Sequence, residues 1–140
     1  MVKIYHVFLF FFITLSLMNS NVFAQKSTIK EHVNQGFTES DASKIGNYFA
    51  ATVSVEIEKQ TGSFNKQHAT SMLKSFFIKN PCKSFKITNS GKVSNSDALF
   101  IIARYESKEK AFRVYILYES PIEKIHSFSI LVYENKHNSN

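Results

Sequence analysis

Residues 98–133 read ALFIIARYESKEKAFRVYILYESPIEKIHSFSILVY, and this segment carries the strongest strand pattern in the chain. Apolar and polar side chains alternate in three runs, at residues 98–105, 111–118 and 125–133, which predicts three strands. The connections between the runs are too short for a crossover, so neighbouring strands are expected to form antiparallel hairpins.

Helical patterns precede this segment. The apolar side chains of residues 66–79 form one stripe at helical spacing, with Asn65 placed to cap the helix and Pro81 placed to end it. Thr28 and Glu31 match a capping box, which predicts a short first helix closed by Gly36.

A second short helix is expected to begin after Asp41 and to run to about Phe49. Strict alternation over residues 52–59 then predicts one half-buried strand. We expect turns at Gly62 and Ser63 and at residues 89–91, the second after a short strand at Phe85 and Ile87.

These elements predict an α+β fold in which helices pack on one face of a curved antiparallel sheet. The expected order is α-α-β-α-β-β-β-β. One domain is expected over residues 25–134, followed by a flexible tail at residues 135–140.

The first 24 residues read as a secretory signal peptide. Lys3 precedes an apolar run at residues 7–17, and Ala24 and Gln25 flank the expected cleavage site. The run is shorter than the roughly 20 residues that a membrane-spanning helix needs. A retained anchor helix is the alternative. We expect the protein to be exported, either periplasmic or secreted, and not to span the membrane after cleavage.

The charge is moderately basic, with 17 Lys and Arg against 11 Asp and Glu. The lysines alternate with apolar residues on predicted elements, as on an ordinary solvated face, and no stacking motif indicates a nucleic-acid partner. Cys82 is the single cysteine, so no internal disulfide can form. We expect Cys82 to be a buried small hydrophobe, with a nucleophile or an intermolecular bridge as alternatives.

Three segments carry a resemblance to a known family: KSFF at residues 74–77, NPCKSFKI at 80–87 and FRVYILY at 112–118. With the order of elements, they resemble an exported bacterial family called domain of unknown function 4783. That family resembles the nuclear transport factor 2-like, or cystatin-like, cone fold. The resemblance implies a bent sheet around a cavity, and it supplies no catalytic residues. Similar sequences tend to carry a second proline at the position of Cys82.

Few residues indicate chemistry. His126 is the one candidate catalytic base, because alternation places it on the same strand face as Phe128 and Ile130, which we expect to be inward. The other histidines lack metal-ligand spacing, so neither a metal nor a cofactor is expected.

The strand at residues 111–118 leaves apolar side chains on its second face. A large apolar patch on a monomer is unusual, so either the sheet bends to bury it or a second subunit covers it, and sheet-to-sheet dimers are frequent among proteins that this one resembles. The expected dimer face comprises Arg113, Tyr115, Leu117, Leu131 and Tyr133.

Two functional hypotheses follow. The first is a non-enzymatic binding module that holds a small apolar ligand in the cone or an envelope protein on the sheet. The second is a small lyase, isomerase or hydrolase that uses His126. A third and weaker hypothesis is an adhesive module that binds anionic glycan or lipid through its lysines.

Overall fold

The computed structural model of the protein describes residues 28–133. The predicted signal segment, its cleavage site at Ala24 and Gln25, and the predicted tail lie outside these residues. Within them, the elements are α2 (Ile29–Thr38), α3 (Ala42–Gly46), β1 (Phe49–Ile57), β2 (Gln60–Asn65), α4 (Lys66–Lys79), β3 (Ser84–Lys92), β4 (Ala98–Glu106), β5 (Ala111–Glu119) and β6 (Lys124–Val132).

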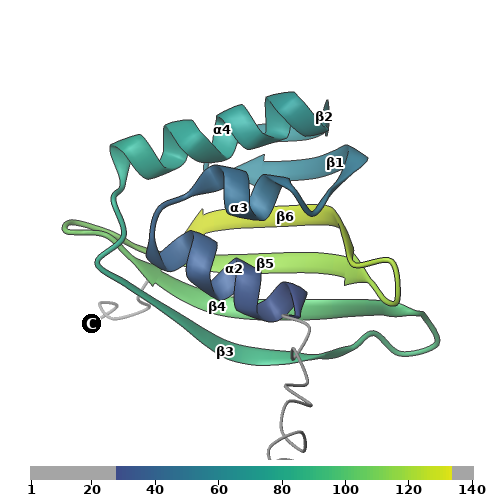
Figure 1. Ribbon diagram of the computed structural model, residues 1–140. Helices are drawn as coiled ribbons and strands as arrows, with labels where there is room; N and C mark the ends of the chain where they lie inside the picture. Colours follow the sequence, from purple (N-terminus) through teal and green to yellow (C-terminus); the bar gives the residue numbers. More distant parts are fainter. Residues whose placement is uncertain (1–27, 134–140) are drawn as a thin grey trace, which may run out of the picture.

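The strands form one open sheet in the order β2-β1-β6-β5-β4-β3, and the helices lie on the same face of it (Figure 1). The α+β prediction is confirmed. The expectation of a purely antiparallel sheet is wrong at one position, because β1 and β6 pair in parallel. After α4 the chain starts again at the far edge with β3, and the hairpins that follow bring β6 back beside β1 in the same direction.

The predicted N-caps are present. The Thr28 hydroxyl accepts a hydrogen bond from the Glu31 amide at 3.4 Å, and the Glu31 carboxylate accepts one from the Thr28 amide at 3.1 Å. The Asn65 side chain accepts from the His68 amide at 2.8 Å. Helix α4 has the predicted bounds, because its cap, its apolar stripe and the following proline all agree.

Two glycines act through close packing. Gly36 was expected to end the first helix, but α2 continues past it, and the left-handed residue is Ser40 with φ of 54°. A Cβ on Gly36 would lie 2.5 Å from Cγ1 of Ile45, and a Cβ on Gly46 would overlap the hydroxyl of Thr70. Glycine is therefore required where α2 meets α3 and where α3 meets α4.

The remaining corrections concern short elements. The second helix does not reach Phe49, which instead begins β1 and is buried. The expected turn at Gly62 lies inside β2, and the true turn is at Glu58 and Lys59. The expected turn at residues 89–91 lies inside β3, which carries a register shift after Ile87. Strands β2 and β3 are the two edges of the sheet, and edge strands facing solvent carry little of the hydrophobic pattern that predicts inner strands.

An aromatic cluster occupies the space between helices and sheet. Its rings stack or meet edge to face, with centroid distances of 4.7 Å for Phe37 and Phe85 and 5.0 Å for Phe76 and Phe112. The cluster consists of Phe37, Phe76, Phe77, Phe85, Tyr105 and Phe112. These side chains fill the middle of the cone. The expected cavity therefore does not extend beneath the whole sheet.

Tyr105 is the polar member of the cluster. Its side chain is fully buried, and its hydroxyl donates a hydrogen bond to the backbone carbonyl of Asn80 at the end of α4. Burial raises the pKa of Tyr105 to about 12. The phenol therefore stays protonated in the folded protein at pH values where an unfolded tyrosine, with a pKa near 10, is charged.

Tyr105→Phe should lower the free energy of unfolding at pH 7 by about 1 kcal/mol, because the Asn80 carbonyl loses its donor. The raised pKa stabilises the wild type below pH 10, and this contribution is lost as pH rises from about 10 to about 12. The wild type should therefore lose stability relative to the variant over that range. Urea unfolding at pH 7, 9 and 11 measures both effects.

Tyr115→Phe is the matched control, because Tyr115 is half-buried on the opposite face of the sheet. This variant should show neither the loss in the free energy of unfolding at pH 7 nor the change in relative stability at high pH. Parallel pH profiles for the wild type and Tyr105→Phe would contradict the raised pKa of the buried phenol, and equal stability at pH 7 would contradict the hydrogen bond to Asn80.

Candidate functional site

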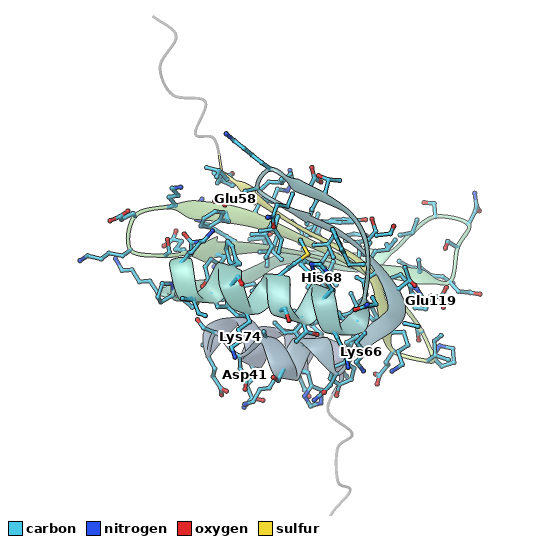
Figure 2. All side chains as sticks on the ribbon, turned by 90° about the horizontal axis from the view of Figure 1, so that it is seen from above. Asp41, Glu58, Lys66, His68, Lys74 and Glu119 are labelled. Carbon is cyan, nitrogen blue, oxygen red and sulfur yellow. The ribbon has the colours of Figure 1, made fainter. Side chains whose placement is uncertain are left out.

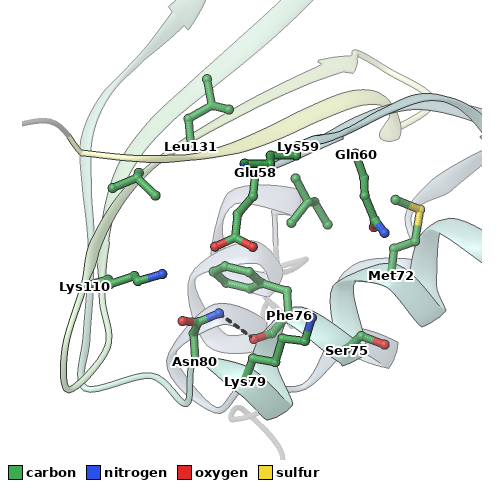
Figure 3. Close-up of a pocket in the computed structure, with 12 residues that line it drawn as sticks. Glu58, Lys59, Gln60, Met72, Ser75, Phe76, Lys79, Asn80, Lys110 and Leu131 are labelled. Atoms are coloured by element: carbon green, nitrogen blue, oxygen red, sulfur yellow. Dashed lines mark hydrogen bonds between the residues drawn. The ribbon is translucent and has the colours of Figure 1, made fainter.

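A pocket opens at one rim of the cone, between the end of α4 and the ends of β1 and β6 (Figure 3). Its volume is about 690 Å³, within the range of about 300–1,000 Å³ that is typical of small-molecule sites. We call it the rim pocket. It is lined by Ile57, Glu58, Lys59, Gln60, Met72, Ser75, Phe76, Lys79, Asn80, Lys110, Leu131 and Val132.

The floor of the rim pocket is apolar. Ile57 and Phe76 are buried, Met72 is half-buried, and the exposed Val132 stands at the edge. Phe76 also belongs to the aromatic cluster, so its ring forms a wall between the filled core and the open pocket. A hydrocarbon group that entered the pocket would therefore meet a rigid surface.

Charged side chains surround this floor. Glu58 has a left-handed backbone with φ of 53°, and its amide donates to the carbonyl of Ile130 at 3.0 Å. Figure 3 shows its carboxylate directed into the pocket above the Phe76 ring. Lys59, Lys79 and Lys110 also line the pocket, each from a different element or connection.

The rim pocket has few side chains that can transfer a proton. Glu58 is the one carboxylate among the residues that line it, Lys59, Lys79 and Lys110 are its cations, and the lining contains neither histidine nor cysteine.

His126 lies away from the rim pocket. A β-bulge at His126 shifts the register between β5 and β6, so Ile125 rather than His126 shares the buried face with Phe128. The expectation that His126 points inward is wrong for this reason. Its side chain is 41% exposed, and Nε2 lies 3.2 Å from a carboxylate oxygen of Glu119 without hydrogen-bond alignment.

Glu119 and Glu58 mark opposite ends of the sheet (Figure 2). Glu119 pairs with the first residue of β6, whereas the Glu58 amide bonds to the carbonyl of Ile130 near the other end of β6. His126 and the rim pocket are therefore separated by most of the length of a strand.

The outer face of the sheet carries the expected apolar side chains and two more. Tyr115 and Leu117 are half-buried, and Phe100 and Ile102 from β4 lie opposite them in the register. The rings of Phe100 and Tyr115 stack with centroids 6.5 Å apart. We call this surface the outer patch, and it consists of Phe100, Ile102, Tyr115, Leu117 and Leu131.

Charged and aromatic residues flank the outer patch. Arg113 is exposed opposite Leu131, and Tyr133 is 45% exposed. The Arg104 guanidinium lies 4.8 Å from the centre of the Tyr133 ring and donates to Glu106 at 2.6 Å. All five residues predicted for a dimer face therefore lie on or beside the outer patch.

Cys82 is half-buried and packs against the core, so it does not reach the predicted full burial. Its amide donates to the hydroxyl of Ser40 at 3.0 Å, which connects the turn after α4 to the turn after α2. Burial raises the pKa of the Cys82 thiol. A raised pKa lowers the thiolate fraction and disfavours a nucleophilic role.

Within residues 28–133, no group of three or more His, Cys, Asp or Glu side chains is arranged to hold a metal ion. In the same part of the chain, no helix is both long and apolar enough to cross a membrane.

The chain matches one known protein family. A family model described as Domain of unknown function (DUF4783) matches residues 30–131. The chain belongs to the DUF4783 family. No curated protein matches it.

Solved structures agree with this assignment. A DUF4783 protein from Bacteroides uniformis ATCC 8492 is 21% identical, with a TM-score of 0.69, and the match covers 75% of this chain and 97% of that one. A DUF4783 protein from Bacteroides ovatus ATCC 8483 is 22% identical, with a TM-score of 0.67 and coverages of 74% and 94%.

An NTF2-like protein of unknown function from Shewanella baltica OS155 is 13% identical, with a TM-score of 0.58 and coverages of 84% and 100%. The predicted resemblance to DUF4783 and to the NTF2-like fold is confirmed. At these identities the solved structures show the fold alone.

The rim pocket was missed by sequence reasoning. Its lining comes from the turn after β1, from α4, from the connection after β4 and from the end of β6, and no local motif joins these segments. The one usable signal was a polar pair, Glu58 and Lys59, directly after an alternating strand. Such a pair reads as an ordinary exposed turn unless the fold is known.

We expect Cys82 to react slowly with Ellman's reagent at pH 7.5, and faster as pH rises, because its pKa lies above that of a free thiol. Unfolding in guanidinium should restore the rate of a model thiol, which provides the control. Equal rates in the folded and unfolded protein would show that the thiol is neither shielded nor shifted.

Proposed function

We propose that this DUF4783 protein is an exported, non-enzymatic binding module that holds a small, largely apolar ligand in the rim pocket. The observation that carries the proposal is a pocket of about 690 Å³ with a floor of Ile57, Met72, Phe76 and Val132. Export is proposed from the signal pattern of residues 1–24.

The enzymatic alternative is less well supported. It requires His126 to face a substrate cavity, whereas the bulge directs this residue toward Glu119 and away from the rim pocket. Within the rim pocket, Glu58 could accept a proton, but the lining contains no second carboxylate and no histidine beside it. A binding role needs neither group.

A second function is favoured by the outer patch. The helices of the described part lie on the other face of the sheet (Figure 1), so no helix within residues 28–133 covers the face that carries Phe100 and Tyr115. Stacked aromatic rings within an apolar patch are typical of a protein interface. We propose that a second copy of the chain covers this patch, with an envelope protein as the alternative partner.

Val132→Trp should occupy part of the pocket floor and weaken binding of the uncharged fluorescent probe N-phenyl-1-naphthylamine by about tenfold, since roughly 60 Å² of apolar contact would be lost. Val132 is 47% exposed, so the substitution leaves the core intact. Fluorescence titration measures the affinity.

Ile122→Trp provides the matched control, because it adds the same indole at an exposed site in the turn between β5 and β6, far from the pocket. It should bind the probe as the wild type does. Equal affinity in both tryptophan variants, or no binding by the wild type, would contradict a ligand site in the rim pocket.

Tyr115→Asp should abolish self-association, because it places a charge in the centre of the outer patch. Light scattering coupled to size-exclusion chromatography measures the mass across a range of concentrations. Ser54 lies in β1 on the same outer face of the sheet, but outside the patch. Ser54→Asp adds the same charge there and should leave the mass unchanged. A wild-type protein that stays monomeric at every concentration would refute the dimer.

A further inference from the structure

The rim pocket carries an excess of positive charge. Three lysines line it, against one carboxylate, which leaves a net charge of +2. Among the described residues, none of the salt bridges includes Lys59, Lys79, Lys110 or Glu58. The charges of the lining are thus uncompensated by close ion pairs within this part of the chain.

The backbone beneath Lys110 is held in place by Ser107. The Ser107 side chain is buried, and its amide and hydroxyl both donate to the carbonyl of Lys110, at 2.9 and 3.1 Å. The Lys110 amide in turn donates to the Ser107 hydroxyl at 3.2 Å. This closed turn fixes the position from which Lys110 extends toward the Glu58 carboxylate in Figure 3.

Lys79 and Lys59 are each adjacent in sequence to a residue whose backbone is held by hydrogen bonds. Lys79 precedes Asn80, whose amide donates to Phe76 and whose carbonyl accepts from the buried Tyr105 hydroxyl. Lys59 follows Glu58, whose amide is bonded to β6. Fixed backbone positions reduce the entropy that the pocket loses when it binds a ligand, so the cationic groups are partly preorganised.

We infer that the rim pocket binds an amphipathic monoanion, a carboxylate on a hydrocarbon chain. The head group would lie among the ammonium groups of Lys59, Lys79 and Lys110, and the chain would lie on Phe76, Met72 and Val132. This inference rests on the proposed function and adds the charge of the ligand to it. Glu58 opposes a second negative charge, which favours a monoanion over a multiply charged ligand.

The test compares octanoate with 1-octanol, which differ mainly in charge at the same chain length, as competitors of N-phenyl-1-naphthylamine at concentrations below micelle formation. Octanoate should bind about tenfold more tightly than octanol at low salt, as expected for a few partly exposed charge pairs. The difference should shrink at high salt, where exposed charges are screened.

Lys110→Gln should weaken octanoate binding about threefold and leave octanol binding unchanged. Lys108→Gln is its matched control, because Lys108 is exposed in the same connection but does not line the pocket. Glu58→Gln should strengthen octanoate binding. Lys79 is less informative, because it lies in the last turn of α4, where a cation also stabilises the helix dipole.

The outcomes separate the two proposals. Equal binding of octanol and octanoate, both lost in Val132→Trp, would overturn the inferred anion and leave the binding module intact. Displacement by neither compound would overturn the inferred anion, and absence of probe binding by the wild type would overturn both proposals. Sedimentation with phosphatidylglycerol vesicles, without affinity for monomeric octanoate, would assign the lysines to a membrane surface and also overturn the inference.

Discussion

The hydrogen bond from the buried Tyr105 hydroxyl to the carbonyl of Asn80 is the constraint on which the arrangement of the domain depends. It joins the C-terminal end of β4 to the point where α4 ends, and it lies inside a cluster of aromatic rings from helices and strands. A buried hydroxyl must find a partner, so the phenol can occupy this place only while α4 ends where it does. The position at which α4 ends and the packing of the helices on the sheet therefore depend on each other.

The same constraint explains why the candidate site lies at the rim. The aromatic cluster fills the centre of the cone, and Phe76 contributes its ring both to that cluster and to the pocket floor. Asn80 and Glu58 lie beside the floor, and hydrogen bonds hold their backbones in place. Lys79 precedes Asn80 and Lys59 follows Glu58, and both lysines line the pocket wall. A domain of this size can thus keep a dense core and still present a concave surface with defined charge.

The two faces of the sheet have different roles. Helices cover the inner face except at the rim pocket, whereas the outer face carries the half-buried rings of Phe100 and Tyr115 stacked against each other. The shared fold with DUF4783 and NTF2-like structures accounts for the inner face, since it is what any member needs in order to pack. Specificity for the proposed ligand and partner would come from the rim and the outer face, because the fold alone does not determine function.

The inner elements can be predicted from the sequence: the capped helix Lys66–Lys79, the three C-terminal strands and the buried faces of β1 and β5, because their hydrophobic periodicity is local and strong. The edge strands, the parallel pairing of β1 with β6 and the bulge at His126 are set by contacts within the folded chain. The rim pocket is formed by such contacts as well. Edge pairing, bulges and pockets depend on contacts between residues far apart in the chain. The local periodicity of the sequence does not encode those contacts.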